Sequence, residues 1–178
     1  NGAIVQPLST TNTLKLTETS TGDVFVNQAQ VTAVDINADN GIVHVLDAVV
    51  LPIETVVDVA IDNGFSTLTT AVVTAELLPV LTDPLAEYTV FAPTNAAFEA
   101  LATSLNTTVP GLLALPNLAD ILTYHVVEGT ILSTALTVGP VTTLNGDDVI
   151  VSLTAGVQIN GELVALADVL ADNGVVHV

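Results

Sequence analysis

One stretch of the chain occurs twice. Residues 31–45 read VTAVDINADNGIVHV, and residues 164–178 read VALADVLADNGVVHV. From Asp35 and Asp168 onward, eight pairs of residues are identical at a constant spacing of 133 positions. Such a period is too long for a solenoid repeat and fits a small domain repeated in tandem. We therefore expect the chain to open late in one domain and to stop just before the end of the next.

Charge and composition exclude several classes of function. Half of the 178 residues are hydrophobic, but Asp and Glu number 19 against a single basic residue, Lys15, which gives a net charge of −18. A chain with a single basic residue cannot neutralise a row of phosphates, so nucleic-acid binding is excluded. Anionic membrane surfaces would repel it, and no apolar stretch is long enough to insert into a bilayer. Weak attraction for calcium is the one electrostatic expectation.

Catalytic and metal-binding motifs are missing. Cys is absent, and the sequence contains no GxSxG, HExxH or phosphate-binding glycine loop, so we expect no enzyme and no cofactor. Residues 35–41 fail as a calcium loop because Asn40 stands where an EF-hand needs glycine and Leu46 where it needs Glu. The adjacent carboxylates Asp147 and Asp148 are expected to be solvated. Asn106 opens a possible glycosylation motif.

Strand and helix patterns separate along the chain. Residues 12–34 alternate or run apolar, which predicts strands. The Asp-Asn-Gly sequences at 39–41 and 172–174 predict hairpins, because Asn and Gly accept positive φ at little cost. Apolar spacing predicts helices over 54–63, 65–81, 95–105 with Thr94 as N-cap, and 117–126, with a buried strand at 88–93 and strands again after 137.

The sequence favours structural roles for the three histidines. His44 and His177 occupy the same repeat position, which favours a polar group satisfied near the core over a titrating site. On the expected helix, His125 follows Tyr124 and shares a face with Ile121 and Leu122. That placement suits a hydrogen bond in helix packing.

Three stretches resemble the fasciclin-type domain family, in the family's order: TVFAPTNAAFEAL (89–101), LADILTYHVVEGTI (118–131) and VQINGELVALADVLADNGVVHV (157–178). The family continues the last stretch with an aspartate and a short apolar strand, which follows Val45 as LDAVVLP (46–52). The resemblance therefore implies that 1–52 is the C-terminal part of a preceding fasciclin-like domain, and that 54–178 is a fasciclin-like domain without its final strand.

The same resemblance implies an α+β fold, a β-sandwich-like wedge flanked by several helices. It also implies a secreted or cell-surface structural protein of tandem repeats that mediates adhesion or matrix and filament assembly. Partners would be other copies of the domain and cell-surface or matrix proteins or glycans. In the family, the pair Tyr124 and His125 is linked to adhesion, so these residues are candidates for either adhesion or packing.

Assembly leaves two alternatives open. Either the chain is cut from a continuous array, which we favour, or separate chains complete one another head to tail by strand donation. The inter-unit strand would then hold Leu46, Val49, Val50 and Leu51. A ligand- or carbohydrate-binding module, with a pocket near His125 or Asp120, is the competing function. Calcium bridging between units is a further expectation from the acidic charge.

Overall fold

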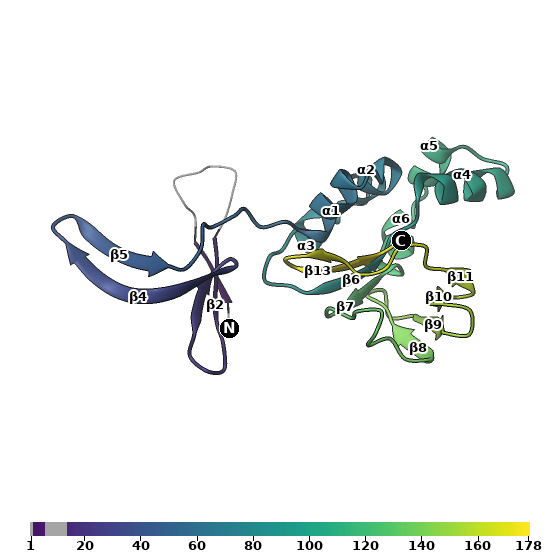
Figure 1. Ribbon diagram of the computed structural model, residues 1–178. Helices are drawn as coiled ribbons and strands as arrows, with labels where there is room; N and C mark the ends of the chain where they lie inside the picture. The colour runs from purple at the N-terminus through teal and green to yellow at the C-terminus, as the bar shows by residue number, and fades with distance from the viewer. Residues whose placement is uncertain (1, 6–13) are drawn as a thin grey trace. The chain divides into compact units, whose positions relative to one another are not determined.

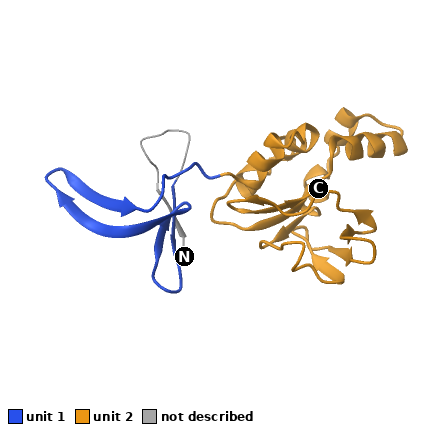
Figure 2. Cartoon of the chain, in the orientation of Figure 1, with its two compact units in different colours: residues 1–53 blue, residues 54–178 orange. Residues whose placement is uncertain are grey.

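The computed structural model describes residues 2–5 and 14–178, and it divides the chain into two compact units, 1–53 and 54–178 (Figures 1 and 2). The boundary between the two compact units lies between Ile53 and Glu54.

Unit 1 is an antiparallel sheet in chain order. Its strands are β1 (Gly2–Val5), β2 (Leu14–Glu18), β3 (Val24–Val26), β4 (Ala29–Ala38) and β5 (Gly41–Leu46). The strands expected within 12–34 are confirmed from residue 14 onward, and residues 12 and 13 lie outside the described part. Asn27 turns the chain between β3 and β4 with φ of 52°. Asn residues tolerate this left-handed conformation better than most side chains.

The β4–β5 hairpin forms at the predicted Asp39-Asn40 turn, but the expected reason is wrong. Neither Asn40 nor its repeat partner Asn173 has positive φ. The left-handed residue is instead Asp35, with φ of 58°, at an irregularity where the pairing shifts register between Ala33 and Ile36. A bulge of this kind re-aims the side chains that follow it along the strand.

Unit 2 contains the helices α1 (Val56–Asp62), α2 (Ser66–Thr74), α3 (Leu78–Leu81), α4 (Asn95–Ser104), α5 (Val109–Leu113) and α6 (Leu118–Thr123). Thr94 caps α4 as predicted, by accepting from the N–H of Ala97. The helix expected over 65–81 is interrupted between α2 and α3, where Glu76 has φ of 57°. Helix α5 was not predicted; it begins after the cap Thr108, with Pro110 in its first turn.

Two open sheets accompany the helices. One has the order β11 (Glu162–Leu163), β10 (Gln158–Ile159), β9 (Asp148–Ser152) and β8 (Gly139–Thr142). The other has the order β12 (Val169–Ala171), β13 (Gly174–His177), β6 (Tyr88–Phe91) and β7 (Val126–Glu128), with β6 parallel to β13. The expected α+β fold, in which β-sandwich-like strands are flanked by several helices, is confirmed, and its sheets are open.

The core of unit 2 lies between this second sheet and the helices. Helix α1 packs on β12 and β13, and α6 packs on β7. The main cluster joins aliphatic side chains of the helices to Val90 of β6, Val126 of β7 and Val176 of β13. Burying one such side chain contributes about 1.5–3 kcal/mol. Strand β13 therefore lies inside the fold, in the sheet that carries the core, and β12 forms the edge of that sheet.

Candidate functional site

Tyr124 and His125 lie at the junction between α6 and β7. The helix expected over 117–126 ends earlier, at Thr123, with Tyr124 as its C-cap. The backbone N–H of Phe91 donates to the His125 carbonyl at 2.8 Å, and Val126 already pairs with Val90 in the sheet. A residue that pairs with a strand cannot also continue the helix, so the tertiary contact with β6 ends α6.

Tyr124 connects this junction to the other sheet. Its hydroxyl donates to the carbonyl of Asp148 at 3.0 Å and accepts from the side-chain amide of Asn160 at 2.9 Å. Its ring packs partly buried against Phe91, Val127 and Val149. The carboxylates of Asp147 and Asp148 are exposed, as expected for a solvated pair. Tyr124 thus acts as a packing residue that ties α6 to β9 and β10.

His125 faces the helix that it follows. Its Nδ1 lies 2.7 Å from the carbonyl of Ile121, one turn back, and donates to it. The hydrogen bond expected from the spacing is present, although His125 itself stands beyond the end of the helix. Tyr124 and His125 meet edge to face, with ring centroids 6.1 Å apart.

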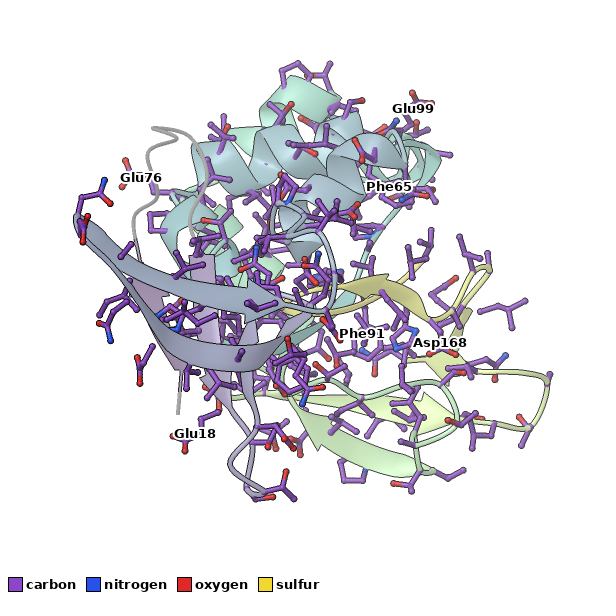
Figure 3. All side chains as sticks on the ribbon, turned by 60° about the vertical axis from the view of Figure 1, so that its left-hand side comes forward. Glu18, Phe65, Glu76, Phe91, Glu99 and Asp168 are labelled. Atoms are coloured by element: carbon purple, nitrogen blue, oxygen red, sulfur yellow. The ribbon has the colours of Figure 1, made fainter. Side chains whose placement is uncertain are left out.

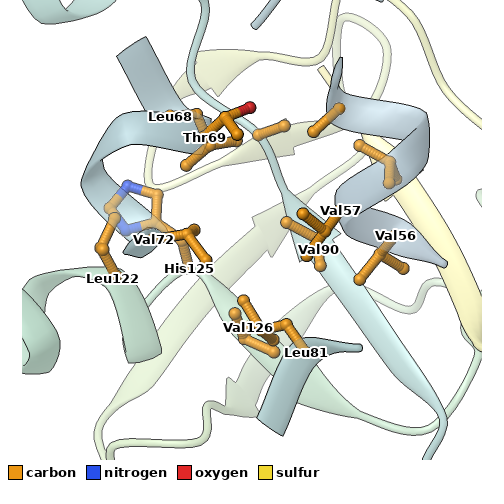
Figure 4. A pocket seen from close by; sticks show the side chains of 13 residues that line it. Val56, Val57, Leu68, Thr69, Val72, Leu81, Val90, Leu122, His125 and Val126 are labelled. Carbon is orange, nitrogen blue, oxygen red and sulfur yellow. The ribbon is translucent and has the colours of Figure 1, made fainter. Parts of the chain in front are cut away.

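The ring of His125 also borders a small apolar cavity (Figure 4). Among the other lining residues are Val72 of α2, Leu122 of α6 and Val126 of β7. The cavity holds about 30 Å³, the space of a few water-sized molecules, whereas ligand pockets begin near 300 Å³. Asp120 is exposed and does not line it. This space does not accommodate a sugar.

The β12–β13 hairpin of unit 2 supplies a second set of hydrogen-bonded polar groups. His177 is 1% exposed. Its Nδ1 accepts from the backbone N–H of Asp168 at 3.2 Å, and its Nε2 donates to the Ile131 carbonyl at 2.9 Å. Its ring stacks on Phe91 with centroids 5.8 Å apart; Phe91 and Asp168 are labelled in Figure 3. The expectation of a satisfied core histidine is confirmed for His177.

Asp168 joins this hairpin to the loop before β8. Its carboxylate accepts from the hydroxyl of Ser133 at 2.5 Å and from the Ser133 backbone N–H at 2.7 Å. These two bonds, the hydroxyl's first, hold the pKa of Asp168 below its usual 3.8. Burial, and secondarily Asp83 and Glu128, raise the pKa of Tyr88 on β6.

Ser133, Asp168 and His177 are not a catalytic triad. The imidazole contacts a backbone N–H of Asp168 and not its carboxylate, and it shows no hydrogen bond to the Ser133 hydroxyl. A serine nucleophile needs a base within hydrogen-bond reach. The three residues instead lock the 131–133 loop onto the hairpin.

Asn173 anchors the turn of the same hairpin. It is 0% exposed, and its side chain accepts from the N–H of Val56 at 2.8 Å and donates to the carbonyls of Leu81 and Asp83 at 2.9 and 3.1 Å. The neighbouring Asp172 exchanges two further bonds with the backbone of Glu54, each 2.7 Å. The sequence predicted Asp172 and Asn173 only as turn residues, and their bonds to distant backbone groups were not foreseen.

In unit 1 the equivalent residues are exposed. The backbone N–H of Asp35 faces Nδ1 of His44 at 3.4 Å, so the local contact between the two residues recurs. However, His44 lies in solvent, and the expectation of a position near the core is wrong for this copy. Asn40 forms no side-chain hydrogen bond with any residue of 14–178 in the structure.

The segment after β5 contains the residues proposed for an inter-unit strand. Leu46 is the last residue of β5, whereas Val49, Val50 and Leu51 belong to neither a helix nor a strand. Val49 is 81% and Leu51 59% exposed. The side chains of Asn27 and Gln28 donate to the carbonyls of Leu51 and Val49 at 2.7 and 2.8 Å, which holds the segment against the β3–β4 turn.

The described residues contain neither a metal-binding cluster nor a membrane-spanning helix. No group of three or more His, Asp or Glu side chains there is placed to hold a metal ion. Within the same part of the chain, every helix is too short or too polar to cross a bilayer.

Comparison with known proteins shows the family of the chain. The model of the fasciclin domain family matches residues 1–52 and 63–178. The chain belongs to the fasciclin domain family. Two Synechocystis proteins are similar to it: the uncharacterized protein sll1735, 40% identical over 69% of this chain and 92% of its own length, and the protein sll1483, 44% identical over 70% and 69%.

Two animal proteins with fasciclin-type similarity are much longer. The transforming growth factor-beta-induced protein ig-h3 of Sus scrofa is 33% identical over 88% of this chain, and human periostin is 28% identical over 99%. The chain spans less than a quarter of either, 23% and 21%. A solved fasciclin domain pair from the insect cell adhesion molecule fasciclin I matches 99% of this chain and 64% of its own, with a TM-score of 0.60 and 18% identity. That likeness shows the shared fold.

Proposed function

We propose that this fasciclin-type chain is a structural, adhesive component of an extracellular or cell-surface assembly, acting through protein–protein contacts and not as an enzyme. The observation that carries the proposal is the hairpin repeated at a spacing of 133, whose second strand is buried in unit 2 and exposed in unit 1. Such a repeat suits a tandem array of domains, in which neighbouring units supply the contacts. The relation to a cell adhesion molecule in fold supports the same function.

Tyr124 and His125 are proposed to act in adhesion indirectly, as packing residues. The Tyr124 hydroxyl and the His125 ring are both engaged within unit 2, which favours support of the surface over direct contact with a partner. Partners in this proposal are other copies of the domain, followed by matrix proteins or glycans at the outer surface.

Adhesion can be measured with beads that carry the chain at controlled density. We expect these beads to aggregate with one another, or to attach to cells or matrix-coated surfaces, in excess of beads coated with an equally acidic, unrelated protein. The same assay with a calcium chelator tests calcium bridging between units, which predicts weaker aggregation after chelation. Beads that neither aggregate nor attach in any arm would contradict the adhesive function.

Head-to-tail polymerisation by strand donation is the second candidate, and the exposure of Val49 and Leu51 favours it. In that case native assemblies would dissociate on denaturing electrophoresis to one short chain, and Val49→Asp together with Leu51→Asp would abolish them. A covalent array would instead give one much larger band. The cavity beside His125 is too small to favour the ligand- or carbohydrate-binding alternative.

A further inference from the structure

The interior strand β9 of the β11–β10–β9–β8 sheet has apolar residues on both of its faces. Val149 and Val151 are 2% and 0% exposed, and Val149 packs against Phe91 of the other sheet. Ile150, between them, is 51% exposed. Successive residues of a strand point to opposite faces, so Ile150 lies on the outer face of this sheet. An unbroken apolar run is typical of strands that are covered on both faces.

The strand register places two more apolar residues on the outer face. Pro140 of β8 pairs directly with Ile150 and is exposed. Leu163 of β11 is in register with Gln158, which is in register with Ser152, two residues after Ile150. Leu163 is 60% exposed. Pro140, Ile150 and Leu163 together form a surface that we call the outer apolar face.

The two sheets of unit 2 differ in what covers them. Helix α1 packs on β12 and β13, and α6 packs on β7. In the part of the chain that the structure describes, strands β8 to β11 make their main contacts with one another, and Figure 1 shows the helices of unit 2 on the opposite side. Domains bury an apolar sheet face against a second layer. The outer apolar face therefore has the composition of a covered surface, and no described helix of unit 2 covers it.

Carboxylates border the outer apolar face. Asp147 and Asp148 are exposed at the start of β9, and Glu162 is exposed beside Leu163 on β11. The single basic residue of the chain, Lys15, belongs to unit 1, so unit 2 has no Lys or Arg to balance these charges. Lys and Arg side chains lay their methylene stems on apolar surface and carry their charge to its rim. A partner with these residues would complement both the apolar centre and the acidic border.

We propose that the outer apolar face binds an amphipathic helix of a partner protein, with Lys or Arg on both sides of its apolar stripe. The stripe covers Pro140, Ile150 and Leu163, and the cations lie over Asp148 and Glu162. A helix is the occupant that the fold favours, because helices cover the other sheet of unit 2. The inference rests on the proposed adhesive function and names the kind of partner that one surface recognises.

A second copy of the chain is a poorer occupant. A symmetric contact brings the same surface of two copies together, so Asp148 and Glu162 of one copy would meet carboxylates of the other. Each copy also has a net charge of −18, which opposes association. An acidic partner protein is disfavoured for the same reason.

The test uses the whole 178-residue chain and a synthetic helix of Leu and Lys that carries one Trp in its apolar stripe. The chain contains no Trp, so Trp fluorescence reports on the peptide alone. We expect saturable binding with a blue shift of the emission, weakened by about fivefold or more when NaCl is raised to roughly 0.5 M. A peptide of the same composition in scrambled order, which has no stripe, should bind at least about tenfold more weakly.

Matched variants locate the bound peptide. Ile150→Asp should weaken binding by about tenfold or more, because it removes apolar area and places a charge under the helix. Val73→Asp on α2 introduces the same charge at a residue of nearly equal exposure, 52%, and should change binding by less than about twofold. Leu163→Asp repeats the test on another strand. The Tm of each variant shows whether unit 2 remains folded.

A second pair of variants tests the acidic border. Asp147→Asn combined with Asp148→Asn should reduce the salt dependence of binding, and asparagine at 148 keeps an oxygen for the Thr142 hydroxyl. Asp62→Asn combined with Glu99→Gln removes the same charge from α1 and α4 and should leave the salt dependence unchanged.

Three outcomes would overturn the proposal. One is equal binding to the parent and to Ile150→Asp, and another is an equal loss in Val73→Asp. The third is self-association of the chain that Ile150→Asp abolishes, which would assign the face to a second copy. Bead adhesion is scored separately. If the beads adhere and the peptide does not bind, this inference fails and the adhesive function stands; if the peptide binds and the beads do not adhere, the reverse holds.

Discussion

His177 accepts a hydrogen bond on Nδ1 from the backbone N–H of Asp168, nine residues earlier across the hairpin. Asp168 has φ of 61°, and its repeat partner Asp35 has φ of 58° while its N–H faces Nδ1 of His44. The left-handed aspartate and its histidine contact therefore arise from the hairpin itself. Their burial depends on the remainder of the domain.

The first prediction concerns Gly174 and Gly41. Gly174→Ala should unfold unit 2 or destabilise it by more than about 4 kcal/mol, because the new Cβ meets the backbone of β6 and the residue has φ of 152°. Gly41→Ala, the same change at the repeat position, should alter stability by less than about 1 kcal/mol. Chemical denaturation of both variants measures the contrast, and similar losses at the two sites would contradict it.

Substitution of Asn173 should likewise destabilise the protein much more than the same substitution at its repeat partner Asn40. Asn173→Ala removes a side chain that serves Val56, Leu81 and Asp83, and leaves buried backbone groups without partners. We expect a loss of about 2–4 kcal/mol, which lowers Tm by on the order of 10 °C. Asn40→Ala is the matched control and should lie within about 0.5 kcal/mol of the parent. A Tm for Asn173→Ala equal to that of its control would refute this assignment.

Acid stability should depend on Ser133. The folded pKa of Asp168 lies below 3.8, so its contribution to stability is complete above that pH and is lost as the pH falls through the folded pKa. Ser133→Ala removes the main cause of the lowered pKa. The gap between the unfolding free energies at pH 6 and at pH 2.5 should therefore narrow in the variant.

The control for this prediction is Ser152→Ala, since the Ser152 hydroxyl forms a hydrogen bond with that of Thr154 and not with a carboxylate of the described residues. It should leave the gap between the two pH values unchanged. If Ser133→Ala changes stability by the same amount at both pH values, its bond to Asp168 does not set the acid dependence.

Tyr124→Phe separates packing from adhesion. The ring stays in place, but the bonds to Asp148 and Asn160 are lost, so we expect a destabilisation of about 0.5–2 kcal/mol. If Tyr124 supports the surface only through packing, adhesion measured well below Tm should be unchanged. Reduced adhesion with parent-like stability would show instead that the hydroxyl meets a partner.

The helix formed by residues 118–123 shows which features of a helix the local sequence pattern can predict. Apolar spacing and the flanking residues predicted the helix and, with Thr94, the start of α4, because caps and amphipathic faces are encoded within a few positions. The end of α6 at Thr123 was not predictable in this way. It follows from the bond between Phe91 and His125, two residues 34 positions apart, which requires the sheet to be assembled.

The repeated hairpin shows the same difference between what the local sequence predicts and what only the tertiary structure decides. Its two occurrences, their turns at Asp39-Asn40 and Asp172-Asn173, and membership of the fasciclin family all follow from residues that are neighbours in the chain. Tertiary structure alone decided that Val176 is buried and Val43 exposed, that Asp168 meets Ser133, and that Asn173 closes three backbone bonds. Identical residues have opposite surroundings because burial is a property of the layers packed around a strand, and those layers come from distant segments.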